Sequence, residues 1–180
     1  MLNEHNGFPR VFLHTGDCYI GVQPTMVTTV LGSCVAVTMF SPQQGISAIC
    51  HAFLPDSSKF STRGTDPQPC RYVDTAVDAM LSSMSRLGAD LDRLEVKIIG
   101  GASGLGGGPR GRGVFDMGVR NAEMAARVLE GRGVRVIDSH VGGNQGRKVV
   151  FLTNTGEIWI KRLVKLMSAE TAVPSGLVCR

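Results

Sequence analysis

The stretch that decides the fold reads TTVLGSCVAVTMF over residues 28–40, SPQQ over 41–44 and GISAICH over 45–51. Two apolar, β-branched runs flank a short polar segment that contains proline, which is typical of a β-hairpin. With the loop at 41–44, Cys34 lies directly opposite His51. Directly opposed residues on antiparallel strands share one face of the sheet, with Cβ atoms about 4.5–5.5 Å apart. The register therefore predicts a thiol beside an imidazole.

A thiol next to an imidazole is an arrangement used for nucleophilic catalysis. A lone cysteine in an apolar strand is more often a small buried hydrophobic residue, and a lone histidine there is more often structural. Two features favour catalysis. Gly32 and Ser33 interrupt the apolar run just before Cys34 and predict a bend that lifts the thiol out of the sheet. His51 lies near a strand end, where a cleft can open. A loop one residue longer or shorter would place the pair on opposite faces.

Short motifs along the chain add to this pair: LGSCVAV at 31–37, HAFLP at 51–55, KIIGGA at 97–102, MGVRN at 117–121, Asp138, GGNQGRKV at 142–149 and NTGE at 154–157. Together they cover roughly residues 11–163, and their order resembles that of the CheD family of bacterial chemoreceptor glutamine deamidases. The glycine-rich segment at 103–113 departs from the family, whose members commonly have a less extreme loop. What this segment contacts stays open.

The resemblance implies a fold, an activity and a set of residues. It maps the family's catalytic cysteine and histidine onto Cys34 and His51, and its threonine onto Thr28, six residues before the cysteine. It implies hydrolysis of receptor glutamine side chains to glutamate in chemotaxis adaptation, and in some members hydrolysis of glutamyl methyl esters. It implies chemoreceptor cytoplasmic domains as substrates and a CheC-type phosphatase as a partner. The family fold resembles the cysteine-histidine core of bacterial toxins that deamidate Rho GTPases.

The residues suit amide hydrolysis. Thiolate is the reactive form of cysteine, and a neighbouring imidazolium lowers the thiol pKa. Backbone N–H groups at the Gly32-Ser33 bend are the expected donors to the tetrahedral oxyanion. His51 would protonate the departing ammonia and then activate water. A third group normally orients the base; Thr28 is the candidate, with Thr29 beside it, and strand alternation lets only one of the two face the site.

Two other functions remain open. The same Cys34–His51 pair could serve another thiol hydrolase, such as a glutamyl methylesterase, a protease or a transglutaminase-like enzyme. The chain could also be a non-catalytic adaptor that binds CheC-like partners. An adaptor predicts the loss of Cys34 or His51, and both are present.

Composition indicates one intracellular domain. The 180 residues fit a single domain with a substantial core, expected over residues 1–167, with a flexible tail at 168–180. The five cysteines, at 18, 34, 50, 70 and 179, form no C-x-x-C motif, so we expect neither a disulfide framework nor a zinc site. An odd cysteine count without a signal peptide favours a reducing, cytoplasmic location. We expect no metal, no cofactor and no membrane insertion.

The net charge of +4 is modest, and few aromatic residues accompany the basic ones, so nucleic-acid binding is not favoured. Arg110, Arg112 and Arg120 flank the glycine-rich segment and are predicted to contact the substrate or a partner. Lys161 and its basic neighbours near the C-terminal strand are predicted to be solvated surface charge.

Periodicity predicts a single α/β (α+β) domain with largely antiparallel sheets and two principal helices, at 72–87 and 118–130. The expected strands are 11–13, 18–22, 25–31, 35–40, 46–53, 95–99, 134–137, 148–153 and 157–164, and residues 55–69 are expected to form a loop. A G-x-G-x-x-G match at 106–111 has no helix directly after it, and the P-loop-like 142–148 lacks the following Ser or Thr, so nucleotide binding is not favoured. We expect the segment at 103–113 to cover the active site.

Overall fold

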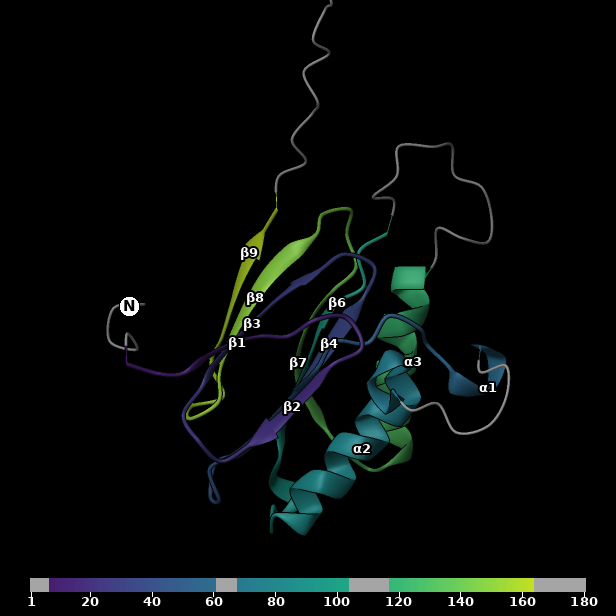
Figure 1. Cartoon of the computed structure of the whole chain (residues 1–180). Helices are drawn as coiled ribbons and strands as arrows, with labels where there is room; N and C mark the ends of the chain where they lie inside the picture. Colours follow the sequence, from purple (N-terminus) through teal and green to yellow (C-terminus); the bar gives the residue numbers. More distant parts are fainter. Residues whose placement is uncertain (1–6, 61–67, 104–116, 164–180) are drawn as a thin grey trace, which may run out of the picture.

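A computed structural model describes residues 7–60, 68–103 and 117–163 of the chain (Figure 1). Its strands are β1 (Arg10–Phe12), β2 (Cys18–Gly21), β3 (Met26–Leu31), β4 (Val35–Ser41), β5 (Ile46–Cys50), β6 (Glu95–Gly100), β7 (Val136–Val141), β8 (Arg147–Leu152) and β9 (Ile158–Arg162). Its helices are α1 (Ser57–Phe60), α2 (Val73–Arg86) and α3 (Met117–Gly131), with short 3-10 turns η2 (Pro69–Arg71) and η3 (Leu91–Arg93).

The strands form two sheets that pack in layers with the helices (Figure 1). One sheet has the order β1-β3-β8-β9 and the other the order β2-β5-β4-β6-β7. All neighbouring pairs are antiparallel except β1–β3 and β6–β7. Helices α2 and α3 cover one face of the five-stranded sheet, and the four-stranded sheet covers its other face. The predicted class, with two principal helices and antiparallel-rich sheets, is confirmed.

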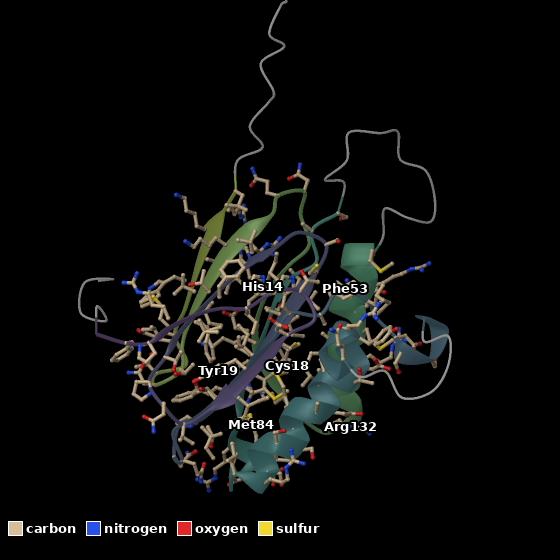
Figure 2. The ribbon with its side chains drawn as sticks, in the orientation of Figure 1. His14, Cys18, Tyr19, Phe53, Met84 and Arg132 are labelled. Carbon is tan, nitrogen blue, oxygen red and sulfur yellow. A yellow bond between two sulfur atoms is a disulfide. The ribbon has the colours of Figure 1, made fainter. Side chains whose placement is uncertain are left out.

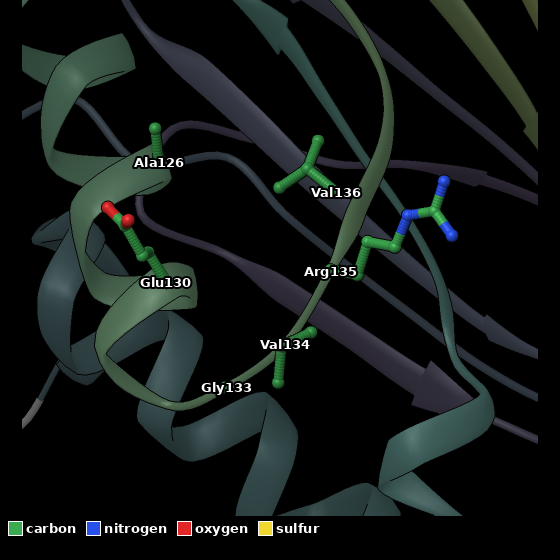
Figure 3. A pocket seen from close by; sticks show the side chains of 6 residues that line it. All are labelled: Ala126, Glu130, Gly133, Val134, Arg135 and Val136. Atoms are coloured by element: carbon green, nitrogen blue, oxygen red, sulfur yellow. The ribbon is translucent and has the colours of Figure 1, made fainter.

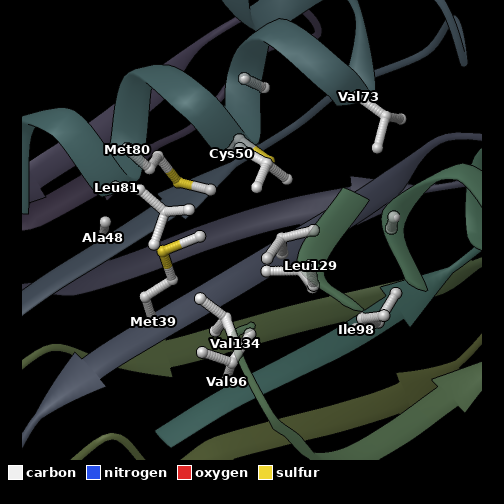
Figure 4. Packing of buried hydrophobic residues seen from close by; sticks show 14 of the residues in the cluster. Met39, Ala48, Cys50, Val73, Met80, Leu81, Val96, Ile98, Leu129 and Val134 are labelled. Atoms are coloured by element: carbon white, nitrogen blue, oxygen red, sulfur yellow. The ribbon is translucent and has the colours of Figure 1, made fainter. Parts of the chain in front are cut away.

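The larger core lies between the helices and the five-stranded sheet (Figure 4). The buried side chains of α2 recur every three or four residues, which is the spacing of one helix face, and they are Val73, Ala76, Val77, Met80, Leu81 and Met84. They pack against sheet residues such as Met39 and Val96 and against Leu129 of α3. The helix ends before Gly88, whose φ of 92° is one that glycine adopts readily.

The predicted hairpin exists, but its register differs by two residues. Ser41 pairs with Ile46, so the loop is 42–45 rather than 41–44. Gly45 closes the turn with a φ of 64° and donates its N–H to the Ser41 carbonyl at 2.9 Å. Extending the register places Cys34 opposite Phe53, one residue beyond the Val35–Ala52 bridge. A shift of two residues preserves the face of every side chain, so Cys34 and His51 become diagonal neighbours on one face.

The predicted bend at Gly32 and Ser33 is present, and it changes the sheet to which the chain belongs. Strand β3 pairs with β8 in the four-stranded sheet, whereas β4 pairs with β5 and β6 in the five-stranded sheet. Residues 32–34 form the crossover between the two sheets. The predicted break between strands 25–31 and 35–40 is therefore also a change of sheet, and Cys34 lies where the chain passes from one strand to the other.

Two other expectations from the sequence are corrected. A disulfide joins Cys18 to Cys70, with Cα atoms 6.0 Å apart (Figure 2); the 52 residues between them hid the pair from an argument based on spacing. The expected loop at 55–69 contains α1, where the Asp74 carboxylate accepts hydrogen bonds from the Ser57 backbone N–H and, at 2.8 Å, from its hydroxyl.

Some expectations concern parts of the chain outside the described residues. These are most of the glycine-rich segment, including Arg110 and Arg112, and the tail at 168–180. Within the described ranges, no helix is long and apolar enough to cross a membrane.

Replacing Gly100 with alanine should destabilise the fold. Gly100 has a φ of 119°, and a Cβ there would lie 2.9 Å from Val35 Cα and closer still to the Cys34 carbonyl oxygen. Backbone in such a region costs of order 1–3 kcal/mol for a non-glycine residue before any overlap is counted. Denaturant unfolding should therefore show a loss of at least about 2 kcal/mol for Gly100→Ala.

Gly131 at the end of α3 supplies the control, because it has open space around its Cα and an ordinary φ. Gly131→Ala should leave the free energy of unfolding unchanged or raise it slightly. Equal stabilities of the two variants would contradict the close approach of β6 to Cys34.

Candidate functional site

The Cys34 thiol lies on the crossover between the sheets, partly buried against the smaller core. Each of the three crossover carbonyls accepts a hydrogen bond. The Gly101 N–H donates to the Cys34 oxygen at 2.7 Å, and the Ala102 N–H donates to the Gly32 oxygen at 2.9 Å. The Asn121 side-chain amide donates to the Ser33 oxygen at 3.0 Å. The backbone that carries the thiol is thus fixed from β6 and from α3.

His51 follows directly after β5 and is buried, with 4% of its surface exposed. Its backbone N–H donates to the Asp17 carbonyl at 2.9 Å, and its carbonyl accepts from the Gly16 N–H at 2.8 Å. The segment between β1 and β2 therefore holds the histidine backbone. His51 and Ile49 are two residues apart and share a face of the strand, and Ile49 belongs to the core between the two sheets. Cys34 packs against the same core.

Thr29 orients the His51 ring. Thr29 Oγ1 lies 2.8 Å from His51 Nδ1 and also donates to the Leu13 carbonyl at 2.8 Å. A hydroxyl has one proton to donate, and here the Leu13 carbonyl receives it, so Nδ1–H of His51 donates to Thr29. The neutral ring then has its free lone pair on Nε2.

The sequence prediction put this contact one residue too early. Thr28 was the candidate for orienting the base, but it alternates with Thr29 and points to the other face of β3. Thr29 is buried, as are Val27 and Leu31 on the same face, whereas Thr28 is partly exposed. The expectation that only one of the two threonines faces the site holds, with Thr29 as that residue.

The Nε2 edge of His51 has a neighbour that the sequence did not reveal. Thr15 Oγ1 lies 3.4 Å from Nε2, and Thr15 is exposed. Cys34 forms no hydrogen bond with the His51 ring in the described structure. Diagonal neighbours in a sheet lie about 7–8 Å apart, which agrees with this. Nε2 can therefore accept a proton from a group that binds beside Thr15.

Burial favours the neutral forms of both groups. It raises the pKa of Cys34, and the residue's own backbone N–H partly offsets this by hydrogen-bonding the sulfur. Burial lowers the pKa of His51, against smaller opposing contributions from the Leu13 carbonyl and the Asp17 charge. The sequence argument assumed a thiolate–imidazolium pair, but these environments favour a neutral thiol and a neutral imidazole at rest.

Cys50 directly precedes His51 in the chain, so strand alternation points the two side chains to opposite faces. Cys50 is fully buried in the core between the sheet and the helices, which is the opposite face of β5 from His51. Burial raises the pKa of Cys50 to about 11, so its thiol stays protonated near neutral pH.

Asn121 is a site residue that the sequence argument placed within a motif but gave no role. It is fully buried on the first turns of α3. Its side-chain amide donates to the Ser33 carbonyl and, at 3.1 Å, to the Phe53 carbonyl. It therefore joins the strand that carries the thiol to the chain that follows the histidine. Its Oδ1 has no hydrogen-bond partner among the residues that the structure describes.

Of the three arginines predicted to contact a substrate or partner, Arg120 lies within the described residues. Arg120 precedes Asn121 on α3 and is exposed, so its side chain is available to a partner. In the described part of the chain, no three His, Cys, Asp or Glu side chains gather as metal ligands.

A separate pocket of about 370 Å³ lies between the end of α3 and the start of β7 (Figure 3). Ala126 and Glu130 line it from the helix, and residues 133–136 line it from the following segment. It contains neither Cys34 nor His51 and has no nucleophilic side chain, so it is not the catalytic site.

Replacing Asn121 with alanine should weaken both the fold and the site. The change leaves the Ser33 and Phe53 carbonyls without their donor, and each buried unpaired group costs about 1–3 kcal/mol. Denaturant unfolding should show this loss. Arg127→Ala, at an exposed position of the same helix, should stay within about 0.5 kcal/mol of the parent. An Asn121→Ala variant as stable as Arg127→Ala would rule out a structural link through Asn121.

Comparisons with known proteins agree on one family. The family model described as CheD chemotactic sensory transduction matches residues 53–162. A protein of Maridesulfovibrio salexigens named probable chemoreceptor glutamine deamidase CheD is 52% identical over 93% of this chain and 99% of its own length. A Geobacter sulfurreducens protein named probable chemoreceptor glutamine deamidase CheD 2 is 42% identical over 91% of this chain and 96% of its own.

A more distant relative is the chemoreceptor glutamine deamidase CheD of Thermotoga maritima, 36% identical over 82% of this chain and 88% of its own length. The family model begins after Cys34 and His51, but the first relative covers nearly the whole chain. The buried histidine, the thiol on the crossover and these extended matches lead to one conclusion: the chain belongs to the CheD family.

Proposed function

We propose that this protein is a chemoreceptor glutamine deamidase, which hydrolyses glutamine side chains of bacterial chemoreceptors to glutamate with release of ammonia. The observation that carries the proposal is a thiol on a fixed crossover, with the Thr29-oriented His51 on the same face. The names of the relatives, from 52% to 36% identical, supply the substrate.

The thiol is the proposed nucleophile. Cys34 would transfer its proton to Nε2 of His51 as its sulfur attacks the glutamine Cδ, which forms a C–S bond and a tetrahedral oxyanion. The Cys34 backbone N–H already lies at the sulfur, so it is the proposed donor to this oxyanion. Gly32 and Ser33 would act by holding that backbone, since their carbonyls are bonded by Ala102 and Asn121.

His51 is the proposed general base and then general acid. Protonated on Nε2, it would return the proton to the nitrogen as the C–N bond breaks and ammonia leaves. The product is a thioester on Cys34. His51 would next take a proton from water, whose oxygen attacks the thioester carbon, and the glutamate product would leave as the thiol re-forms. Thr29 would keep Nδ1–H engaged throughout.

The location and partners follow from this activity. A cytoplasmic location fits an enzyme that acts on receptor cytoplasmic domains. A CheC-type phosphatase as partner rests on the family resemblance and stays a prediction, as do contacts made by Arg110, Arg112 and Arg120. Glutamyl methyl ester hydrolysis would use the same acyl-transfer steps with methanol as the leaving group.

The direct test is mass spectrometry of a receptor cytoplasmic fragment after incubation with the protein, because conversion of glutamine to glutamate raises the mass at a definable residue. Cys34→Ala should abolish conversion. Cys50→Ala should retain most of it, since that thiol lies in the other core. Loss of activity in Cys50→Ala alone would contradict the assignment of the nucleophile.

The pH dependence distinguishes a neutral pair from an ion pair. His51 must be unprotonated to accept the thiol proton, and its pKa lies below its ordinary value of 6.5; the midpoint of the acid fall in kcat/KM should therefore lie below 6.5. The thiol proton must be present to reach the leaving ammonia, and the Cys34 pKa lies above its ordinary value of 9.0; the midpoint of the alkaline fall should therefore lie above 9.0.

A wide plateau between these limits is the expected profile, and an alkaline fall centred well below pH 9 would indicate an ion pair instead. His51→Asn should reduce turnover by about a thousandfold or more, because members of a catalytic unit fail together. It should leave the slow alkylation of Cys34 by iodoacetamide at pH 7 nearly unchanged, since the thiol is already neutral in the parent.

A further inference from the structure

A group of basic side chains lies where β7 and β9 end and β8 begins, near the crossover. Arg147 pairs directly with Arg162, and Lys148 pairs directly with Lys161. Like charges directly opposite on neighbouring strands are destabilising. Alternation places the two arginines on one face of the sheet and the two lysines on the other. The sequence indicated solvated surface charge here, but the arginine pair has a different environment from the lysine pair.

Within the part of the chain that the structure describes, Arg147 is a buried cation without an anionic partner. Only 3% of its surface is exposed. Its guanidinium donates to the His140 and Gly142 carbonyls, and its Nε has no partner among the described residues. Among the described residues, neither Arg147 nor Arg162 forms an ion pair. Burial lowers the pKa of Arg147, and the Arg162 charge adds to this. A buried charge without a counter-charge is costly, so the site favours an added anion.

The histidine between the two arginines presents an unmatched donor. Arg147 Nη1 lies 3.1 Å from His140 Nδ1, and Arg162 Nη2 lies 3.5 Å from His140 Nε2. Arginine can only donate. A neutral imidazole accepts at one ring nitrogen only, so it can serve one of the two arginines and turns an N–H toward the other. Two donors thus face each other without an acceptor, and an anionic oxygen between them would receive both.

These groups line a cavity of about 210 Å³ together with the 142–145 segment, which is room for a carboxylate. The cavity adjoins the catalytic crossover. The Gly142 N–H donates to the Gly100 carbonyl at 2.9 Å, and the Ser103 N–H donates to the Gly143 carbonyl at 2.8 Å. The neighbouring Gly101 N–H is bonded to the Cys34 carbonyl, and Arg147 itself pairs with Leu31.

We infer that the cavity formed by His140, Arg147 and Arg162 is a subsite that binds a carboxylate side chain of the protein substrate while a glutamine occupies the Cys34 site. The inference rests on the proposed function and deepens it. Arginine matches a carboxylate with two parallel hydrogen bonds, and Arg162 is exposed, so it can meet an incoming side chain. The subsite selects glutamines that have an acidic residue at a fixed spacing in the folded substrate.

The test measures deamidation of a receptor cytoplasmic fragment by mass spectrometry over a range of fragment concentrations, in phosphate-free buffer. Arg162→Gln should raise KM about tenfold, as expected for loss of a hydrogen bond to a charged group, and should change KM more than kcat. Lys161→Gln is the matched control, because it removes the same charge from the adjacent position on the other face; it should change KM less than twofold. Equal effects of the two variants would overturn the subsite.

Binding measurements separate the two hypotheses. Cys34→Ala should bind the fragment, and adding Arg162→Gln should weaken that binding about tenfold. If the parent converts no glutamine while this binding difference is present, the subsite stands and the deamidase proposal fails. If the parent converts glutamine but Arg162→Gln leaves KM unchanged, the deamidase proposal stands and the subsite fails. A further outcome concerns inorganic phosphate added as a competitor of the fragment. In this outcome phosphate competes in the parent but not in Arg162→Gln, while the KM measured without phosphate is the same in both. The occupant is then a free anion, and the inference is overturned.

Discussion

The candidate active site depends on the passage of the chain from one sheet to the other at residues 32–34. Where a chain passes from one sheet to another, the carbonyls of the connecting residues have no neighbouring strand to supply a donor. A buried carbonyl must then find its donor elsewhere. Here two donors are backbone N–H groups after β6, and the third is the Asn121 amide. The close approach requires glycine at position 100. These hydrogen bonds hold the backbone that carries the Cys34 thiol. Their donors come from α3 and from the chain after β6, so the thiol position depends on how the helix and the sheets pack.

Three layers each contribute to the site. The crossover brings the thiol, β5 brings the histidine, and α3 brings the amide that joins their flanking backbone. The segment before β2 encloses the histidine and supplies both Thr15 and the Asp17 carbonyl. The site is therefore assembled from parts far apart in sequence, and its geometry depends on the correct stacking of the whole domain.

The sequence predicted the faces of the side chains better than it predicted their contacts. The alternation of apolar residues placed Cys34 and His51 on one face, and a register error of two residues left this result intact. The error came from Gly45, whose turn conformation moved the loop, and turn type is weakly encoded in a single sequence. The contact with His51 falls on Thr29 rather than Thr28 for a related reason: β3 belongs to a different sheet from β4, so the position of a threonine along the chain did not reveal which face meets the histidine.

Contacts between remote segments could not be inferred from local patterns. Asn121 lies 88 residues from Ser33, and the Cys18–Cys70 disulfide spans 52 residues. Nor did composition distinguish Arg162 from Lys161, which are adjacent in sequence but lie on opposite faces of one strand. The helices, by contrast, repeat their apolar residues locally, and their bounds differed from expectation by no more than one residue at each end.

The burial that raises the pKa of Cys34 and lowers that of His51 has a consequence for chemical inhibition. Reagents that select cysteines by their thiolate fraction would find little advantage at Cys34 over an ordinary surface thiol. A better inhibitor would carry a weakly electrophilic carbon beside an atom that can accept a proton. In the bound complex, Nε2 of His51 could take the thiol proton while the C–S bond forms, and then pass the proton to that atom. Selectivity toward this enzyme would come from the shape of the bound electrophile, with intrinsic thiol acidity contributing little.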